Sequence, residues 1–589
     1  MRNTVNTLFR TALPRYGKRS VFFLTVMAIP VLLILLGQSA LLSVEGEWAA
    51  CCRIAVDGGI GADGIMWQPE NFHNIIFGRV VREFSRLFPL SEWLIRIPAM
   101  LAALAFLAGS MVLALEVADR KTAVFTGWLM LSSYGFLYWG RVGSGQMFAA
   151  AAVIWAAVVF YGRTRNQRLS FHIGLDFFFL FFITLIMCGI TPALGMVMFL
   201  LPQWVAIFTP RKWTWRQTGI LLASAVCAGV IIVMLISVAI CLRRMNFSFS
   251  ENLHYILWIA QQLCRSTVRA FFSSAGINFA ENLLHLPRLM LPWVVLLPAA
   301  VCSLWKKRHE LQDEHKRLLW GIGLFILCTG IYPVRRWGAM LPMLGPVLII
   351  LALGLSSRFR HEIWETRVEI VVRSIFIVAA SLAMALPCTW PLWNKLLGVK
   401  PPLLLMVVSA VTGILALLVL TYGIRPGNMA EKIIKRQSPL AGTVFAGVML
   451  AIFVNCVLFP EMNMFRTERA FWQRSSSELA QCYPQPEGVI FYKMRIPEAA
   501  IFYLESKIPF QTVASAEKLD ALLKRSGGSI AVISHTSPDV KEELRTLVAN
   551  NRRRFRGSGI LAAEAHPVVF VRSDRRSADD GYALWVLEF

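Results

Sequence analysis

Long apolar segments recur along this chain from near the N-terminus to about residue 459. A helix needs roughly 20 apolar residues to cross the hydrocarbon of a bilayer, and about thirteen segments approach that length. They lie near residues 21–42, 94–115, 121–138, 146–161, 175–190, 192–208, 219–242, 289–304, 318–332, 337–355, 368–387, 402–423 and 439–459. Because 56% of the residues are hydrophobic and only 16% are charged, the sequence predicts a polytopic α-helical membrane protein.

Basic residues between these segments predict the side on which each loop lies. Lys and Arg near span ends collect in cytoplasmic loops. Here they fall in alternate loops, before the first span and near residues 120–121, 163–168, 211–216, 306–308, 358–367 and 432–436. This alternation predicts a cytoplasmic N-terminus in an inner or plasma membrane, with loops 43–93 and 243–288 and the C-terminal segment outside. The basic loops predicted to be cytoplasmic hold much of the net charge of +24. The charge therefore reflects membrane topology and does not indicate a nucleic-acid partner.

The character of the sequence changes near residue 461. The apolar spans end, and β-branched runs such as GVIFY, SIAVIS and HPVVFVRS alternate with helical stretches such as AEKLDALLKRS and PDVKEELRTLVANN. This alternation is typical of a small α/β domain. We therefore predict a transmembrane domain at 1–461 and an extracytoplasmic α/β domain at 462–589.

The first outer loop carries a further helical pattern in PENFHNIIFGRVVREFSRLFP, at residues 69–89. Its apolar residues recur at helical spacing and face away from its charged ones. Such a helix either lies in the plane of the membrane interface or packs on the helical bundle. The sequence leaves both alternatives open.

Polar side chains at the outer ends of the spans are the candidates for chemistry. Ionisable groups at membrane depth are costly and usually face a cavity. Arginine suits a phosphate because its planar guanidinium presents two N–H groups to two oxygens, and a carboxylate can act as a general base toward a hydroxyl. The candidates are Glu45, Glu47, Arg141, Gln146, Thr191, His285, Arg335 and Arg336.

The order of several short motifs resembles the GT-C superfamily of membrane glycosyltransferases. The motifs are VEGEWAACCRIAVDGG, LIRIPAMLAALAFLAGSMVLA, GRVGSGQMFAAAAVIWA, ITPALGMVMFLLP and RRWGAMLPMLGPVLIILA. They are similar to motifs of the branch that contains protein O-mannosyltransferases and the lipid A aminoarabinose transferase. The resemblance implies a GT-C fold and an inverting transfer of a sugar from a polyprenyl-phosphate donor to a lipid, glycan or protein acceptor on the outer side.

The resemblance also implies roles for the candidates, although the acidic motifs are degenerate. Val44 stands where the family has its first-loop Asp, and Glu45 matches the second acid. If the alignment is shifted by one residue, Glu45 takes the position of that Asp. Glu47 lies near enough to replace the Asp functionally. Glu45 and Glu47 are thus expected to be catalytic. We expect Arg141, Arg335 and Arg336 to bind the donor phosphate, and Gln146, Thr191 and His285 to line the site.

Other interpretations stay open. The protein could be a non-catalytic GT-C relative that binds a lipid-linked sugar, or a lipid or solute transporter. The two glutamates could begin a solvated loop, the Arg335–Arg336 pair could anchor a span end in lipid headgroups, and His285 could be an interfacial helix residue. No cysteine or histidine spacing indicates metal ligands, and a divalent metal cofactor is neither implied nor excluded.

The predicted topology can be tested by labelling cysteines from outside intact cells. We expect a membrane-impermeant thiol reagent to label native Cys482 and the variant Gly46→Cys, and to spare Gln312→Cys, because the basic loops place Gln312 in the cytoplasm. Exposed native cysteines serve as the background control. Labelling of Gln312→Cys together with protection of Gly46→Cys would invert the topology.

Overall fold

The computed structural model describes the chain in segments. They are residues 15–33, 45–56, 81–164, 171–188, 190–208, 279–331, 337–355, 362–385, 403–422, 440–454, 469–481, 486–504, 509–525, 529–535, 538–550 and 582–588, with residues 36, 78, 223, 227, 387–388 and 554–555. These segments form two compact units. The first unit comprises Met1–Leu36 and Arg96–Phe459, and the second comprises Gly37–Ile95 and Pro460–Phe589. The boundaries predicted at 461 and 462 stay a prediction.

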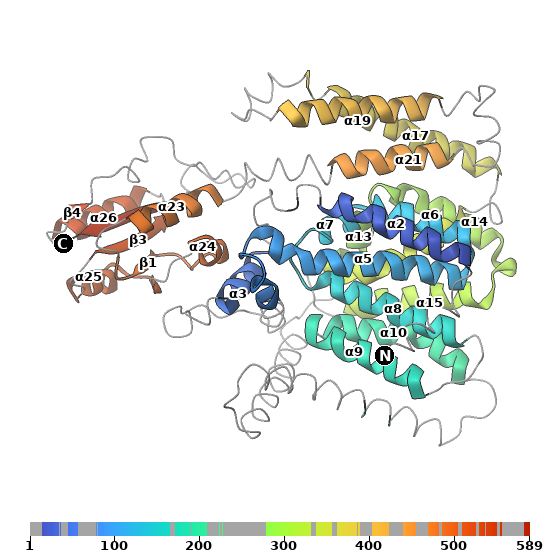
Figure 1. Ribbon diagram of the computed structural model, residues 1–589, viewed down its shortest axis with the longest axis horizontal. Helices are drawn as coiled ribbons and strands as arrows, with labels where there is room; N and C mark the ends of the chain where they lie inside the picture. The colour runs from blue at the N-terminus through green and yellow to red at the C-terminus, as the bar shows by residue number, and fades with distance from the viewer. Residues whose placement is uncertain are drawn as a thin grey trace. The chain divides into compact units, whose positions relative to one another are not determined.

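Helices make up the first unit (Figure 1). They are α2 (Arg15–Leu33), α5 (Glu92–Val117, which begins in the second unit), α6 (Arg120–Leu131), α7 (Tyr134–Trp139), α8 (Gln146–Thr164), α9 (Phe171–Cys188), α10 (Ile190–Phe208), α13 (Phe279–Met290), α14 (Leu297–Lys306), α15 (Asp313–Ile331), α16 (Leu344–Gly354), α17 (Glu362–Ala385), α19 (Leu403–Tyr422) and α21 (Leu440–Ile452). Three short 3₁₀ helices, η1 (Trp293–Leu296), η2 (Arg308–Glu310) and η3 (Trp337–Met343), join some of them.

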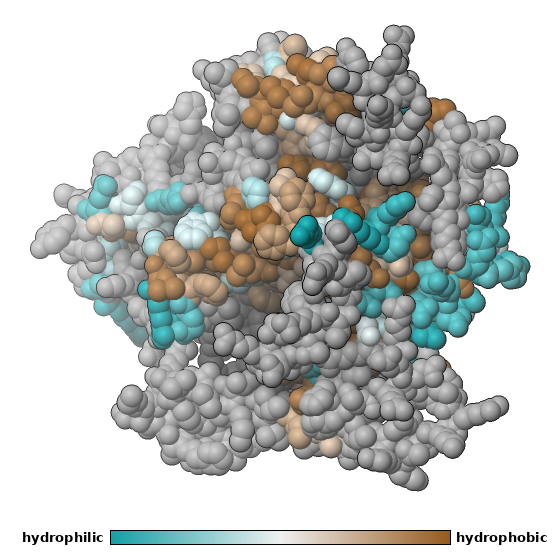
Figure 2. All heavy atoms as spheres, turned by 45° about the vertical axis from the view of Figure 1, so that its right-hand side comes forward, coloured by the Kyte–Doolittle hydropathy of each residue, from teal (hydrophilic) through white to brown (hydrophobic). Residues whose placement is uncertain are grey.

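One of the described helices, α5, is long and apolar enough to cross a membrane. The pair 284–290 and 293–306, bent by 109°, would add a second if it forms one span. Other apolar helices are shorter, so the count of about thirteen spans stays a prediction. Side chains such as Ile370, Val378, Leu382 and Val407 are exposed on α17 and α19, and Figure 2 shows broad hydrophobic areas on the surface. Such areas suit contact with lipid.

Small residues let helices of the first unit approach closely. A Cβ added at Gly354 of α16 would lie 2.7 Å from the carbonyl oxygen of Ala300 in α14. The same addition at Gly413 of α19 would lie 2.6 Å from the backbone nitrogen of Met384 in α17. At Gly321 of α15 it would lie 2.3 Å from the carbonyl oxygen of Phe199 in α10. Glycines at such contacts are typical of helix packing in membranes, where close backbone approach replaces the hydrophobic effect.

The second unit is built on a five-stranded sheet in the order β2-β1-β3-β5-β4. The strands are β1 (Val489–Tyr492), β2 (Phe510–Val513), β3 (Ile530–His535), β4 (Arg554–Phe555) and β5 (Tyr582–Glu588). The first three run parallel, and β5 is antiparallel to β3 and β4. Helices α23 (Arg469–Gln481), α24 (Glu498–Tyr503), α25 (Ala516–Arg525) and α26 (Pro538–Asn550) alternate with the strands. Ile490 and Val532 of the sheet pack with Leu519, Leu523 and Leu544 of the helices.

The segment predicted to form the first outer loop, residues 43–93, belongs to this second unit. Its helix α3 (Gly46–Val56) meets the middle of the expected amphipathic segment at Gly78, where a Cβ would lie 2.6 Å from the Cys51 carbonyl oxygen. Residues 81–85 are helical. Val81 is buried, whereas Leu87 and Phe88 after the helix are exposed. This segment therefore packs on α3, and whether its exposed end lies in a membrane interface stays a prediction.

Two glycines of α15 provide a matched test of helix packing. Gly321→Ala should destabilise the protein by about 1–3 kcal/mol, because the added methyl group overpacks the Phe199 backbone. Gly323 has no atom within 4 Å of an added Cβ, so Gly323→Ala should be neutral or stabilise by up to about 1 kcal/mol. Thermal unfolding of both variants in detergent measures the difference. Equal melting temperatures would contradict this packing.

Candidate functional site

Glu45 is fully buried in the second unit. It lies at the N-terminal end of α3, and its backbone carbonyl accepts the first helical hydrogen bond from Ala49 at 2.8 Å. A carboxylate here is favoured by the partial positive charge of the helix N-terminus. The expectation of a solvated loop start is therefore wrong for Glu45. Glu47 follows within α3, and its side chain lies outside the described residues.

Helix α3 is attached to α24 of the α/β sheet domain. Arg53 donates from Nε and Nη2 to the carbonyl oxygen of Phe502, at 3.3 and 3.2 Å. Its guanidinium also lies 5.8 Å from the centroid of the Phe502 ring. Because one side chain holds both the backbone and the ring of the same residue, it fixes both the position and the orientation of α3 on α24.

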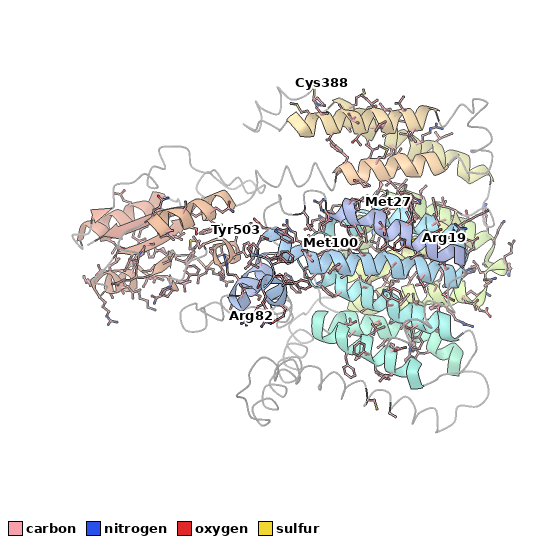
Figure 3. The ribbon with its side chains drawn as sticks, in the orientation of Figure 1. Arg19, Met27, Arg82, Met100, Cys388 and Tyr503 are labelled. Atoms are coloured by element: carbon pink, nitrogen blue, oxygen red, sulfur yellow. The ribbon has the colours of Figure 1, made fainter. Side chains whose placement is uncertain are left out.

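A second hydrogen bond joins the same two parts of the unit. The Tyr503 hydroxyl and Oε1 of Glu92 lie 3.1 Å apart in a buried environment. Glu92 is in the first turn of α5. Residues 46–56 and the start of α5 are thus both attached to the short helix α24, on which Tyr503 is labelled in Figure 3.

Arg141 lies in the first unit, in the turn between α7 and α8, and is 8% exposed. Its backbone nitrogen donates to the Tyr138 carbonyl at 3.1 Å. Gly140, just before it, fits tightly, because a Cβ there would lie 3.0 Å from both Ala103 and Leu32. This packing fixes the turn. A buried guanidinium in a fixed turn is suited to a recessed anion site.

The segment after the two other candidate arginines lies beside this turn. Gly338 of η3 would carry a Cβ 2.9 Å from the Trp139 ring and 3.0 Å from Gln146 Cγ. The structure thus brings Gln146, at the start of α8, together with η3. Arg335 and Arg336 themselves lie outside the described residues.

His285 is half-buried on α13, which packs against α7. Gly135 of α7 would carry a Cβ 2.8 Å from Leu289, and the Arg288 guanidinium lies 6.0 Å from the Tyr134 ring centroid. Helices α13, α8 and η3 therefore meet around α7. Thr191 is in the first turn of α10, and its side chain lies outside the described residues.

Some polar residues of these regions were not identified as candidates from the sequence. Arg53, Glu92 and Tyr503 have no spacing that links them, because their contact joins segments far apart in the chain. Arg96 is 1% exposed, and its Nη1 donates to the Leu36 carbonyl at 2.5 Å. The Arg-x-Pro motif at 96–98 was the available signal for it.

The chemistry of the remaining titratable groups is limited. Among the described residues, no group of three or more His, Cys, Asp or Glu side chains could hold a metal ion. Burial raises the pKa of the Cys52 thiol well above its ordinary value, and the neighbouring Cys51 adds to this. Cys52 is therefore a neutral thiol at physiological pH, which fits a packing role rather than a reactive one.

The ion pair between Lys493 and Glu543 lies at the carboxyl end of β1. Their Nζ and Oε2 atoms are 2.6 Å apart, and Lys493 has a φ of 54°. The hydrogen bond from Lys493 holds the pKa of Glu543 below its usual range. The two charges of this pair therefore neutralise each other.

Comparison with solved structures identifies the fold. ArnT from Cupriavidus metallidurans bound to undecaprenyl phosphate matches with a TM-score of 0.64 and 15% identity, over 96% of this chain and 97% of that one. The apo form matches with a TM-score of 0.63 over the same shares. The arabinosyltransferase EmbB from Mycobacterium smegmatis matches at 0.42, with 16% identity over 78% of this chain and 43% of that one. No family model matches the sequence, and neither does any curated protein.

The likeness to ArnT spans nearly the whole of both chains. It confirms the GT-C resemblance indicated by the sequence motifs at the level of the fold. The chain therefore shares the fold of ArnT.

The attachment of α3 can be tested with Arg53→Gln. The substitution removes a charged donor from two hydrogen bonds and should weaken the attachment by about 1.5 kcal/mol. Backbone amides of residues 46–56 should then exchange with deuterium roughly tenfold faster by local opening. Arg86→Gln is the matched control, because Arg86 pairs at 2.6 Å with Glu83 in an exposed ion pair. Unchanged exchange in α3 would remove Arg53 as its anchor.

Proposed function

We propose that this protein is a membrane glycosyltransferase that moves a sugar from a polyprenyl-phosphate donor to a lipid, glycan or protein acceptor outside the cytoplasm. The observation that carries the proposal is the match over 96% of the chain to ArnT bound to undecaprenyl phosphate. The predicted orientation, with the α/β domain extracytoplasmic, is part of the proposal. A lipid carrier suits such a fold, because its tail can stay in the bilayer while its phosphate reaches the protein.

The proposed base is Glu45, with Glu47 as the substitute. A carboxylate would remove the proton of the acceptor hydroxyl while the acceptor oxygen attacks the anomeric carbon. The bond from that carbon to the phosphate oxygen breaks, and polyprenyl phosphate leaves with the electron pair. The complete burial of Glu45 supports this role, since a buried carboxylate is costly to retain and is commonly found at functional positions.

The proposed phosphate ligands are Arg141, Arg335 and Arg336. A guanidinium stabilises the charge that develops on the departing phosphate and can bind two of its oxygens. Arg141 is the best supported of the three because it is buried in a fixed turn. The packing of Gly338 near that turn supports the contribution of the other two. Gln146, Thr191 and His285 are proposed to line the site.

The alternative is a non-catalytic relative that binds a lipid-linked sugar. The observation that favours it is Val44 at the position of the family Asp. A valine cannot accept a proton, so catalysis would rest on Glu45 or Glu47. The two functions differ in turnover but share the binding of the lipid phosphate.

The test is turnover of a panel of polyprenyl-phosphate sugars by the purified, reconstituted protein. Glu45→Gln, Glu47→Gln or the double variant should lower turnover by about 10²- to 10⁴-fold, because Gln keeps the shape but cannot take the proton. Binding of undecaprenyl phosphate should survive. Val44→Asp should raise turnover. In the same experiment, Arg141→Lys should weaken binding of undecaprenyl phosphate about tenfold, because Lys keeps the charge but loses the bidentate fork.

Controls separate these effects from misfolding. Glu83→Gln and Arg86→Lys change exposed residues of the first loop and should leave turnover and binding unchanged. Full turnover in the double Gln variant would exclude both carboxylates. Unaltered phosphate binding in Arg141→Lys and Arg141→Ala would exclude that arginine. Binding without turnover in every form, including Val44→Asp, would establish the non-catalytic relative.

A further inference from the structure

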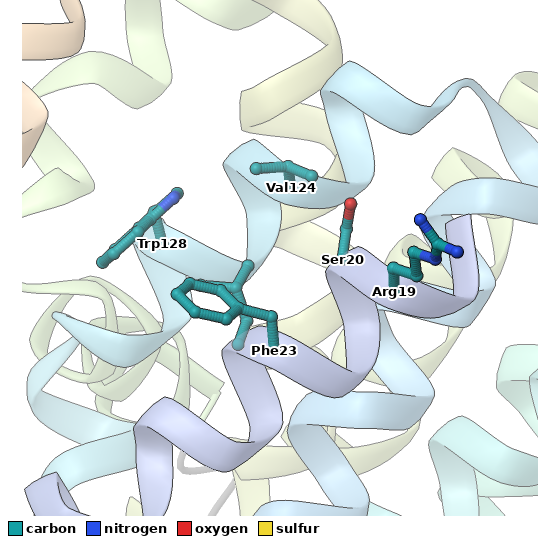
Figure 4. A pocket seen from close by; sticks show the side chains of 6 residues that line it. Arg19, Ser20, Phe23, Val124 and Trp128 are labelled. Atoms are coloured by element: carbon teal, nitrogen blue, oxygen red, sulfur yellow. The ribbon is translucent and has the colours of Figure 1, made fainter. Parts of the chain in front are cut away.

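A pocket of about 290 Å³ lies on the first unit between α2 and α6. Arg19, Ser20, Phe23 and Leu24 of α2 line it together with Val124 and Trp128 of α6 (Figure 4). The polar residues Arg19 and Ser20 are near the start of α2, and the apolar ones follow one turn later. The pocket is therefore amphipathic along the helix axis.

Arg19 lines the polar edge of the pocket, and Arg120 lies next to this edge through its contact with Ser20. Arg120, the first residue of α6, donates from Nε and Nη2 to the Ser20 hydroxyl oxygen at 3.3 and 3.1 Å. Arg19 is exposed beside it. Within the part of the chain that the structure describes, neither forms an ion pair with a carboxylate. The adjacent acid, Asp119, caps α6 by accepting from the Thr122 backbone nitrogen at 2.7 Å.

The apolar wall continues along α2. Phe22 and Phe23 are 72% and 58% exposed, and Val26 and Met27 are also exposed. Arg19 and Met27, labelled in Figure 3, are eight residues apart, or about 12 Å along a helix. Leu24 closes the floor of the pocket, because Gly127 of α6 would carry a Cβ only 2.9 Å from it. Exposed aromatic and aliphatic side chains below two cations match the division of a phospholipid into headgroup and acyl chain.

We propose that this pocket binds an anionic phospholipid of the membrane leaflet that α2 and α6 face with their first turns. The phosphodiester lies between the guanidiniums of Arg19 and Arg120, and an acyl chain lies along Phe23, Val26 and Met27. Basic pockets between transmembrane helices select anionic headgroups electrostatically. Ser20 holds Arg120 in place before the lipid arrives, which lowers the entropic cost of binding. The site is separate from the proposed glycosyl transfer and does not depend on it.

The experiment is native mass spectrometry of the full-length protein extracted from vesicles with equal amounts of phosphatidylglycerol and phosphatidylcholine. We expect wild type to retain phosphatidylglycerol at least fivefold over phosphatidylcholine. The double variant Arg19→Gln/Arg120→Gln should retain both lipids about equally. Lys306→Gln/Lys316→Gln removes the same charge at exposed positions elsewhere in the unit and should behave as wild type. Inorganic phosphate at about 10 mM should not displace the lipid, because it has no acyl chain.

Two single variants test the same pocket if the double variant does not fold. Ser20→Ala retains every charge but releases Arg120, so it should lower the selectivity, and Phe23→Ser should lower total lipid retention. Equal retention of the two lipids by wild type would overturn the proposal. So would an effect of the control pair equal to that of the arginine pair, or displacement of the lipid by inorganic phosphate.

Discussion

The contact of Arg53 with Phe502 is the interaction on which the second unit depends. It joins residues 449 positions apart, one from a loop after the first predicted span and one from the C-terminal sheet domain. Closing so long a separation has an entropic cost that grows only slowly with length, so a few well-placed polar bonds can hold it. The guanidinium supplies two hydrogen bonds and a ring contact at one residue, and Tyr503 adds a bond to Glu92. Through them, α3 and the start of α5 are both held on α24 of the sheet domain.

The sequence predicted the helices and strands better than it predicted which distant segments contact each other. Apolar periodicity and β-branched runs reflect local burial, so the helical part and the α/β character of the C-terminal segment were readable. The grouping of residues 37–95 with the C-terminal segment was not, because no local pattern encodes which distant surface a short loop helix meets. The sequence left open whether Glu45 is buried or begins a solvated loop, for the same reason. A charged residue at the end of an apolar run resembles a solvated loop until its neighbours are known.

The arginines give a second example of tertiary packing that the sequence pattern does not predict. Composition and the positive-inside rule treat all basic residues at span ends as equivalent, yet their settings differ. Arg141 is buried beside the tightly packed Gly140, and Arg96 is buried against the Leu36 carbonyl. Arg19 instead lines an open amphipathic pocket, and the exposed Arg120 donates to Ser20 in the lining of that pocket. A buried guanidinium is costly to desolvate and needs fixed partners, whereas an exposed one can meet lipid headgroups at little cost. The difference lies in tertiary packing, which a charge count does not contain.

In the proposed reaction, Val44 in place of an aspartate changes the position of the base more than its chemistry. Glutamate has the same reacting group as aspartate but one more methylene, and Glu45 begins one residue later. A catalytic carboxylate must be held within a fraction of an ångström to be effective, because small misplacements greatly reduce rates. The burial of Glu45, just before α3, restricts its side chain, and the anchoring of α3 on α24 restricts the helix that follows it. For Glu45 to act as the proposed base one residue after Val44, α3 must therefore be held firmly. Because α24 holds α3, the proposed role of Glu45 depends on the C-terminal domain.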